Sequence, residues 1–333
     1  VRYSEGEFAA ERIDQVLRRV RRRDAAGRLE RLEWRHASTD AVVAGFAYRW
    51  GVDGLIASLR SKTGEDRFAF DVLGRLIVRE RHRPGAGTAG IQAAYFHYSP
   101  AGDLLASRDA GGTTHRWSAI AQDQLGRPLA HGPWRLHYGP QGRIERIERT
   151  EGGPGAGSGP TAGYSYRYNA LGERVGKRER TMGEPGKARG YLYHQQSLAA
   201  ELDAHGRITR HYIRWQGQVL AIVDIVAGDS VLHRLGLRRA PAYRISYLLA
   251  DHLGTPHVAV DERGRTVWQA EYGPYGQVLT ESGPLEQALR LPGQYHDRET
   301  GLYDNYQRTY DPARGRYLEP DPLGLAAGWN LYA

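Results

Sequence analysis

The chain has 333 residues, a formal net charge of +8 and no cysteine, with 42 glycines and 21 tyrosines against a single methionine. The absence of cysteine excludes disulfides, thiolate zinc sites and a cysteine nucleophile, and no stretch approaches the 18 uninterrupted apolar residues of a membrane-spanning helix. The length favours two domains or one elongated repeat structure, and the glycine and tyrosine content favours strands and turns over helices.

Positive charge is spread along the chain and comes almost wholly from arginine. Only Lys62, Lys177 and Lys187 are lysines, and only the stretch RRVRRRD at residues 18 to 24 is densely basic. A nucleic-acid interface concentrates its cations in a patch or stripe. We therefore expect solvated strand faces, and no nucleic acid bound by this segment. The first residues lack both an initiating methionine and a signal pattern, which indicates an internal piece of a longer chain.

One short pattern, Asp-x-x-Gly-Arg between two strand-like runs, recurs along the sequence. It stands in RRDAAGRLERLEW (22 to 34), FAFDVLGRLIVRE (68 to 80), AIAQDQLGRPLAH (119 to 131), AAELDAHGRITRHY (199 to 212) and HVAVDERGRTVWQ (257 to 269). With its variants the pattern supplies nine turn glycines, namely Gly27, Gly54, Gly74, Gly102, Gly126, Gly142, Gly172, Gly206 and Gly264. The aspartate, or asparagine at position 169, can accept a hydrogen bond from the backbone two residues on, and the glycine can take the left-handed conformation that closes a hairpin.

Repeated β-hairpins of this kind have to associate, because one hairpin cannot bury its apolar face. Alternation in YSYRYN (164 to 169) and RISYLL (244 to 249) predicts strands with one packed and one wet face. The glycine-rich runs at 151 to 163 and 181 to 190 are expected to be exposed loops. The sequence therefore predicts an irregular array of hairpins that forms a long curling sheet.

Two longer segments make the pattern specific. They are SYLLADHLGTPHVAVDERGRTVWQAEYGPYGQV (246 to 278) and ETGLYDNYQRTYDPARGRYLEPDPLGLAAGWNLY (299 to 332), which contains Asp-Pro-x-Gly-Leu near its end. Together with the repeats they resemble the Rhs or YD-repeat proteins. The resemblance implies an all-β fold, a spiral array of hairpins that forms part of a hollow shell and is closed by a C-terminal Rhs core. It implies YD repeats over residues 1 to 245, the core with a self-protease over 246 to 325, and the start of a released segment at 326 to 333.

The resemblance also implies a function. In this family the shell encloses the C-terminal toxin of the same polypeptide, and an aspartic self-protease cuts after the leucine of the motif, here between Leu325 and Ala326. The toxin enzyme would follow the chain. Implied partners are this toxin, its immunity protein, secretion tip proteins and a chaperone, with export from a bacterium, type VI secretion being the expected route, and with no cofactor. The alternative is a non-enzymatic carrier or adhesion module, as in a toxin-complex C component or a cell-surface protein.

Peptide hydrolysis by carboxylates needs two of them sharing a proton, one to deprotonate water and one to protonate the leaving group. The resemblance favours Asp321, in the cleavage motif, with Asp297 as its partner and Arg298 to orient a carboxylate or stabilise charge. Asp304 and Glu299 stay as rival partners. Six acids lie in the last 40 residues: Asp297, Glu299, Asp304, Asp311, Glu319 and Asp321. We expect a solvated Glu319 and a low-dielectric shell of Tyr303, Tyr306, Tyr310 and Tyr317.

A structural interpretation competes with catalysis, because Asp-Pro commonly opens a turn, and Asp297, Asp311 and Asp321 could all be turn caps. The Asp-His pair in DHLG (251 to 254) is likewise interpreted as a hairpin turn. The 13 histidines form no His-x-x-x-His pair on a helical run, so no metal site is expected. Sugar binding by surface aromatics is a weaker possibility.

Overall fold

The computed structural model describes residues 2 to 4, 8 to 85, 90 to 109, 111 to 117, 121 to 150, 160 to 181, 186 to 226 and 242 to 333. The predicted loop at 151 to 163 lies outside the described residues up to 159, and that at 181 to 190 lies outside them from 182 to 185. Among the described residues, no helix is both long and apolar enough to cross a membrane.

The chain forms two compact units. The first comprises residues 1 to 118 and 249 to 285. It contains an antiparallel sheet in which each strand pairs with the next along the chain, and three further strands that follow later in the sequence. The strands are β1 (Arg2–Ser4), β2 (Phe8–Ile13), β3 (Leu17–Arg23), β4 (Leu29–His36), β5 (Val42–Trp50), β6 (Ile56–Ser61), β7 (Gly64–Phe70), β8 (Leu76–His82), β9 (Ile91–Tyr98), β10 (Leu104–Arg108), β11 (Thr114–Arg116), β22 (Pro256–Asp261), β23 (Thr266–Tyr272) and β24 (Val278–Ser282).

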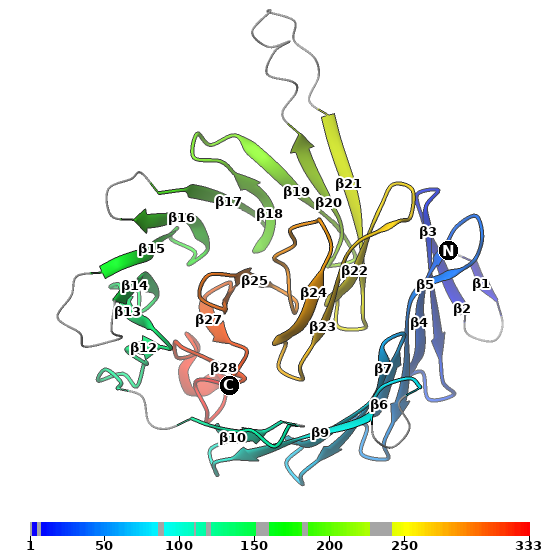
Figure 1. Cartoon of the computed structure of the whole chain (residues 1–333), viewed down its shortest axis with the longest axis horizontal. Coiled ribbons are helices and arrows are strands. Elements are labelled where there is room, and N and C mark those ends of the chain that lie inside the picture. The colour runs from blue at the N-terminus through cyan, green and yellow to red at the C-terminus, as the bar shows by residue number, and fades with distance from the viewer. Residues whose placement is uncertain are drawn as a thin grey trace, which may run out of the picture. The chain divides into compact units, whose positions relative to one another are not determined.

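The second unit comprises residues 119 to 248 and 286 to 333. Its long sheet again pairs neighbours in sequence, as the green strands of Figure 1 show. The strands are β12 (Ala130–His131), β13 (Trp134–Tyr138), β14 (Ile144–Thr150), β15 (Pro160–Tyr168), β16 (Arg174–Thr181), β17 (Ala188–His194), β18 (Ser197–Leu202), β19 (Ile208–Trp215), β20 (Gln218–Val226) and β21 (Ala242–Ala250), whose last two residues belong to the first unit. The sequence predicts functional boundaries between residues 245 and 246 and between residues 325 and 326. The two compact units divide the chain at other positions and do not test these boundaries, which stay predictions.

The repeated turn has the predicted chemistry. All nine turn glycines have positive φ, between 75° and 91°, so the left-handed conformation closes each hairpin. In the turn of Asp123, Oδ1 accepts the backbone N–H of Leu125 at 2.9 Å and of Arg127 at 3.0 Å. Oδ2 accepts Nε–H of Arg127 at 2.7 Å. The same three bonds recur at Asp24, Asp71, Asp203 and Asp261. The arginine of the pattern thus pairs with its own aspartate four residues earlier.

In several of the repeat turns, an aromatic side chain of a later strand contacts the turn arginine. The guanidinium of Arg127 lies 4.3 Å from the ring centre of Tyr138, whose hydroxyl donates to the Pro128 carbonyl at 2.8 Å. The cation is attracted to the ring face, and the hydroxyl satisfies a backbone acceptor. Arg28 with Trp50, Arg75 with Tyr98 and Arg143 with Tyr168 repeat the arrangement. Neighbouring hairpins are therefore connected by one recurring contact.

The segment after residue 285 forms a small separate sheet in the second unit. It consists of β25 (Gln294–Asp297), β26 (Leu302–Asn305), β27 (Arg308–Asp311) and β28 (Arg316–Tyr317), followed by the 3-10 helix η2 (Gly324–Ala327). Leu302 of β26 and Leu318 belong to one hydrophobic cluster with residues of β13 to β15, namely Trp134, Leu136, Ile144, Ile147 and Tyr166. Burial of these apolar side chains seats the small sheet on the long one.

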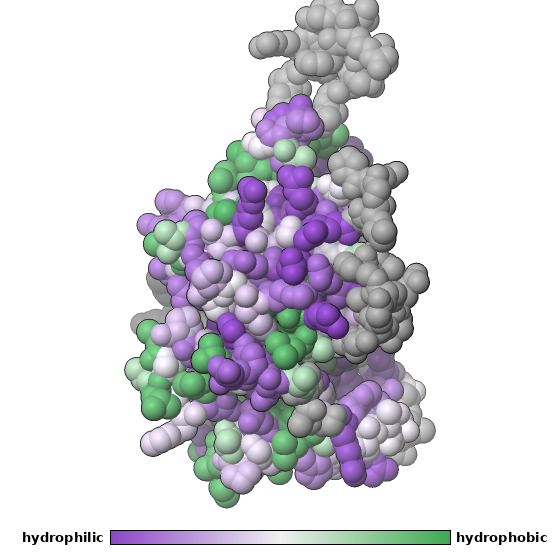
Figure 2. All heavy atoms as spheres, turned by 90° about the vertical axis from the view of Figure 1, so that its left-hand side faces the viewer, coloured by the Kyte–Doolittle hydropathy of each residue, from purple (hydrophilic) through white to green (hydrophobic). Residues whose placement is uncertain are grey.

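One face of the molecule is mainly polar. Figure 2 shows the side of the molecule on the left of Figure 1, where hydrophilic residues dominate and hydrophobic ones form separate patches. In the basic stretch, Arg21 pairs with Glu11 and Arg22 with Glu30. Arg19 also pairs with Glu11 but is only 3% exposed, so the predicted solvated face does not extend to it. Alternation fails in RISYLL, because residues 246 to 249 are all buried and both faces of this part of β21 are covered.

Candidate functional site

The hairpin of β25 and β26 carries two buried aspartates on one face. Tyr295 pairs with Asp304 in the register of the two strands, and Asp297 lies two residues beyond Tyr295. Because side chains alternate along a strand and paired residues share a face, Asp297 and Asp304 point to the same side. Their exposed fractions are 3% and 4%, so both are removed from bulk water.

Asp297 is bound by two cations from β16. Its Oδ2 accepts Nη1–H of Arg174 at 2.5 Å, and its Oδ1 accepts Nζ–H of Lys177 at 2.8 Å. Burial alone would raise the pKa of Asp297, but the charges of Arg174 and Lys177 outweigh it and lower that pKa to about 2. Lys177 also pairs with Glu299. Asp297 is therefore an ionised carboxylate held in a protein interior.

Asp304 has a weaker set of partners. Nη2–H of Arg143 donates to Oδ1 at 3.1 Å, and Nε of Arg174 lies 3.7 Å from Oδ2. Burial raises the pKa of Asp304 more than these guanidinium groups lower it, and the negative charge of Asp297 adds to the rise. Two neighbouring carboxyls thus have pKa values displaced in opposite directions, which is the arrangement an acid and a base require.

Glu319 is buried, and the prediction that it is solvated was wrong. Its exposed fraction is 2%. Its carboxylate accepts the backbone N–H of Thr309 at 2.7 Å and of Ile144 at 3.2 Å, and Nε of Arg143 lies 3.8 Å away. Burial raises the pKa of Glu319 despite these partners. The residue closes the segment after β28 onto β14, because its acceptors satisfy two backbone amides that would otherwise be buried without a bond.

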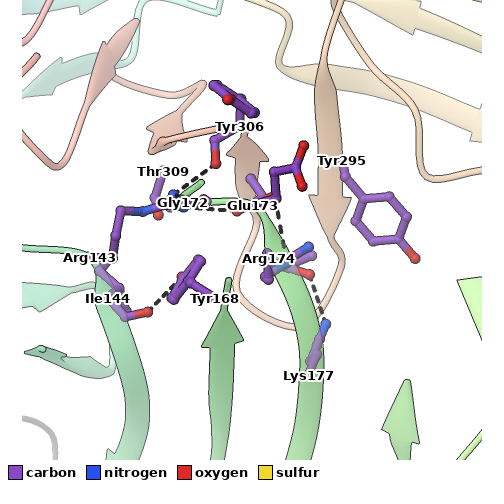
Figure 3. Close-up of polar contacts among 12 residues, drawn as sticks. Arg143, Ile144, Tyr168, Gly172, Glu173, Arg174, Lys177, Tyr295, Tyr306 and Thr309 are labelled. Carbon is purple, nitrogen blue, oxygen red and sulfur yellow. Dashed lines mark hydrogen bonds and ion pairs between the residues drawn. The ribbon is translucent and has the colours of Figure 1, made fainter. Parts of the chain in front are cut away.

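Aromatic rings enclose the central guanidinium. The Cζ of Arg174 lies 5.3 Å from the ring centre of Tyr166, 5.1 Å from that of Tyr191 and 5.5 Å from that of Tyr295. These rings supply the low-dielectric shell expected from Tyr303, Tyr306, Tyr310 and Tyr317. Tyr303, Tyr310 and Tyr317 instead contact one another, with the first pair of rings tilted and the second edge to face, at centroid distances of 6.3 and 5.3 Å. Figure 3 shows Arg143 reaching the backbone of Gly172 and Tyr306, and Arg174 beside Lys177.

Seven charged residues are joined by ion pairs, and we call them the charge network. It consists of Arg143, Arg174, Lys177, Asp297, Glu299, Asp304 and Glu319. All of its acids lie in the last 37 residues, whereas all of its cations lie in the repeats. A register shift in the β15–β16 pairing, where Arg167 faces Gly176 but Tyr168 faces Arg174, marks a bulge at Val175. The bulge turns Arg174 and Lys177 to one face although they are three residues apart.

The repeat pattern contains a signal for Arg143. In the turn GPQGR, Gly139 stands where the repeat normally has aspartate. Arg143 therefore has no turn carboxylate four residues earlier, and it pairs with Asp304 and Glu319 instead. In the next turn Asn169 and Glu173 replace the aspartate and arginine and bond to each other at 2.7 Å. An exception to the pattern could thus have identified a site residue, but sequence reasoning missed it.

Asp321 occupies a different position from Asp297. Its Oδ1 accepts the N–H of Leu323 at 2.9 Å, and its Oδ2 lies 3.1 Å from Nη2 of Arg308. Asp321 thus closes a turn, as the structural interpretation expects. Within residues 242 to 333, all of which the structure describes, no hydrogen bond or ion pair joins Asp321 to Asp297. Their pairing as a dyad stays a prediction. Asp304 shares Arg174 with Asp297, and Glu299 shares Lys177 with it.

The other predicted site residues are on the surface or in turns. Leu325 and Ala326 are exposed in η2, which contains no buried residue. Arg298 follows Asp297 in the chain, and its Nη2 donates to the Gln287 carbonyl at 3.2 Å. Asp311 closes a turn through the N–H of Ala313 at 3.0 Å.

The Asp251 turn is a hairpin turn, as interpreted from the sequence. Its Oδ1 accepts the N–H groups of Leu253, Gly254 and Thr255. Thr255 stands at the arginine position, and Oδ2 of Asp251 lies 3.4 Å from Nε2 of His257. Among the described residues no group of three or more His, Asp or Glu side chains could hold a metal ion.

A cavity of about 630 Å³ lies beside the charge network in the second unit. Lys177, Tyr295, His296, Arg298 and Glu299 contribute to its wall, so the two direct neighbours of Asp297 in the chain and one of its cations face it. The cavity wall therefore includes a residue that is hydrogen-bonded to Asp297. Its remaining wall is formed by residues of β15 to β20, by Lys187 and Asp203 beside these strands, and by residues 286 to 288.

Comparison with known proteins agrees with this architecture. The structure superimposes on the Photorhabdus luminescens Tc holotoxin pore with a TM-score of 0.76, 16% sequence identity, and coverage of 97% of this chain and 18% of that one. In sequence it is 28% identical to the toxin protein Tse5 of Pseudomonas aeruginosa, over 96% of this chain and 28% of that protein. It is 27% identical to RhsB of Dickeya dadantii, named a probable deoxyribonuclease, over 86% of this chain and 19% of that protein.

The chain spans less than a third of the length of either of these curated relatives. The model of the Teneurin YD-shell family matches residues 67 to 327. The all-β array of YD-repeat hairpins is thereby confirmed, as is the resemblance to Rhs proteins. The chain belongs to the Teneurin YD-shell family, as a shell segment of the Rhs type.

Proposed function

We propose that this chain is the shell part of a toxin precursor that cuts its own backbone between Leu325 and Ala326 and so frees an enclosed C-terminal effector. The observation that carries the proposal is the pair of buried carboxyls on one face of β25 and β26. Asp297 is held ionised by Arg174 and Lys177, and the pKa of Asp304 is raised by burial. One relative named a toxin protein and another named a probable deoxyribonuclease support the cargo.

The chemistry consumes one water. Asp297 takes a proton from the water, whose oxygen bonds to the carbonyl carbon of Leu325. A protonated carboxyl gives its proton to the nitrogen of Ala326, the C–N bond breaks, and Leu325 becomes a new carboxyl terminus. One carboxyl ends the step protonated and the other ionised, so a single turnover needs no cofactor.

The scissile bond has to move for this reaction to occur. Leu325 is 69% exposed and lies in a 3-10 turn, whereas Asp297 is buried and hydrogen-bonded to Lys177. Hydrolysis needs the bond within about 3.5 Å of the attacking water. We expect the segment after Glu319 to leave Arg308, extend, and approach Asp297 through the cavity lined by Lys177 and Glu299. Asp321, four residues before the bond, would travel with it.

The setting of the proposal is a bacterium that exports the precursor, type VI secretion being the expected route, with secretion tip proteins, a chaperone and an immunity protein as partners. A carrier that does not cleave itself is the second candidate. The observation that favours it is Asp321, which closes its turn through Leu323 and pairs with Arg308, as an aspartate without a catalytic role would.

The test is the mass of the full-length precursor after expression. The unchanged precursor is expected to split after Leu325, at a rate independent of protein concentration, while Asp297→Asn leaves it whole. Asp71→Asn is the matched control, because Asp71 closes a repeat turn and does not line the cavity. Asp321→Asn decides whether Asp321 is a chemical partner or a turn cap. An unchanged precursor that stays whole, or an Asp297→Asn precursor that is cut at the same rate, would contradict self-cleavage.

A further inference from the structure

The charge network is assembled from two distant parts of the chain. Asp297 and Asp304 belong to the terminal sheet, while the cations that contact them belong to hairpins more than 110 residues earlier. One of these cations, Arg174, contacts both aspartates. A single guanidinium therefore stands between the two carboxyls whose protonation the proposed self-cleavage requires to differ.

The contacts of Arg174 are unequal. Nη1 donates to Asp297 Oδ2 at 2.5 Å, whereas Nε lies 3.7 Å from Asp304 Oδ2, beyond hydrogen-bond distance. The Nε is buried and forms no hydrogen bond within the described part of the chain. Since a charge-assisted hydrogen bond favours the ionised carboxylate far more than a longer contact does, Arg174 stabilises the anion of Asp297 in preference to that of Asp304.

The other neighbours add to the inequality. Lys177 gives Asp297 a second hydrogen-bonded cation at 2.8 Å, while the remaining cation at Asp304 is Arg143 at 3.1 Å. The charged and titratable groups that face Asp297 come from β15, β16, β17, β25, β26 and the turn after β25: Tyr164, Tyr166, Arg174, Lys177, Tyr191, Tyr295, Glu299 and Asp304. Of these only Arg174 and Lys177 carry positive charge, so the ionised state of Asp297 depends on them.

We propose that Arg174 is a positioning residue for the self-cleavage, which keeps the proton off Asp297 and leaves it on Asp304, so that base and acid lie on either side of one guanidinium. The inference rests on the proposed function. In the reaction Asp297 accepts a proton from water, the water oxygen bonds to the Leu325 carbonyl carbon, and the Asp304 proton passes to the Ala326 nitrogen as the C–N bond breaks. Because Arg174 comes from a repeat, the site becomes competent only when the terminal sheet is seated on β16.

The experiment measures the rate of precursor cleavage against pH for the unchanged protein, Arg174→Gln and Arg174→Lys. Removing a hydrogen-bonded cation shifts the pKa of a carboxyl by about 1 to 3 units. The acidic limb of the Arg174→Gln profile is therefore expected to move to higher pH by about that amount, with about a tenfold lower rate per unit below it. Arg174→Lys keeps the charge and is expected to restore most of the shift.

The control is Arg178→Gln, which removes an exposed arginine from the same strand and is expected to leave the profile unchanged. A purely structural role for Arg174 predicts a lower rate with an unmoved acidic limb, and that result would overturn the inference.

A second readout does not depend on cleavage. The titration of Asp297 is followed by carboxyl-carbon NMR of the 333-residue chain, with the signal assigned by its loss in Asp297→Asn. The inference expects the Asp297 titration to move to higher pH in Arg174→Gln, and an unmoved titration overturns it. Failure of the unchanged precursor to cut refutes the proposed function, and the NMR titration still decides whether Arg174 sets the state of Asp297.

Discussion

Aspartate–arginine pairs occur in two regions of this protein under opposite conditions. In the repeat turns, Asp123 pairs with Arg127 four residues later, near the surface. In the terminal sheet, Asp297 pairs with Arg174, which lies 123 residues earlier, and both side chains are at most 4% exposed. A solvated pair contributes little beyond its turn, whereas breaking a buried pair leaves a charge without compensation in the interior. The same chemistry closes a hairpin in one region and builds a site in the other.

The two regions differ because a repeat arginine pairs within its own turn only where the turn aspartate is present. Where the repeat aspartate is present, its arginine is used locally. Where Gly139 replaces it, Arg143 becomes available to Asp304 and Glu319. The departure at Gly139 therefore identifies one hairpin that contacts the terminal sheet.

The largest effect is expected from Arg143→Met. The variant leaves Asp304 without its closest cation and Glu319 without any, and it removes two donors from the Gly172 and Tyr306 carbonyls. Loss of one partner from a buried ionic group costs about 3 to 5 kcal/mol. Urea unfolding followed by tryptophan fluorescence measures it.

Arg265→Met is the control for that measurement, because it removes an arginine whose side chain is 67% exposed in a repeat turn. Its expected cost is below about 1 kcal/mol. Equal losses in the two variants would mean that the buried and surface pairs do not differ.

Two substitutions of Asp123 are expected to have smaller effects on stability. They separate the contribution of the turn's backbone hydrogen bonds from that of its ion pair. Asp123→Ala loses the acceptor of the Leu125 and Arg127 amides, at an expected cost of about 1 to 2 kcal/mol. Asp123→Asn keeps that acceptor and loses only the charge, so a cost below about 0.5 kcal/mol is expected. The natural Asn169, which makes the same two backbone bonds, indicates that the cap is the essential part. An Asn variant as unstable as the Ala variant would show that the ion pair matters more.

Local features of the fold could be predicted from the sequence. The turn aspartates and glycines act within five residues, so their spacing alone specifies each hairpin. The arrangement of hairpins and the acid-rich terminal segment could likewise be predicted. Burial of residues 246 to 249 on both faces could not, because alternation describes one strand and not what covers it.

The partners of the acids could not be predicted, because they depend on tertiary contacts. Nothing near Asp297 in sequence indicates Arg174 or Lys177. Arg298, its direct neighbour, lies in the turn after β25 and donates to the Gln287 carbonyl instead. In the sequence Glu319 resembles a solvated strand residue. In the fold its carboxylate accepts the backbone amides of Thr309 and Ile144. Its burial follows from the register of the terminal sheet, which the sequence does not specify.

The smallest net change at pH 7 is expected from Glu319→Gln, because two effects oppose each other. Burial raises the pKa of Glu319 above its unfolded value of about 4.3, so the ionised carboxylate lowers stability above the folded pKa, and this penalty vanishes as pH falls below the unfolded pKa. Glutamine is always neutral and avoids the penalty. Its single oxygen accepts only one of the Thr309 and Ile144 amides, which bond to different oxygens of Glu319, and the other amide loses its acceptor at a cost of about 1 to 3 kcal/mol. We expect the unchanged protein to gain stability relative to the variant as pH falls from 7 toward 4.

Asp297→Asn tests the same linkage from the other side. Because the pKa of Asp297 is lowered to about 2, its ionised form stabilises the fold at pH values above the unfolded pKa of about 3.9, and that stabilisation is lost as pH falls toward 2. The variant should be less stable than the unchanged protein at pH 7 and approach it in acid. Urea unfolding of the unchanged protein and both variants between pH 7 and pH 2 gives the two slopes. Slopes of the same sign would contradict the assignment of Asp297 as the ionised and Glu319 as the protonatable carboxyl of the charge network.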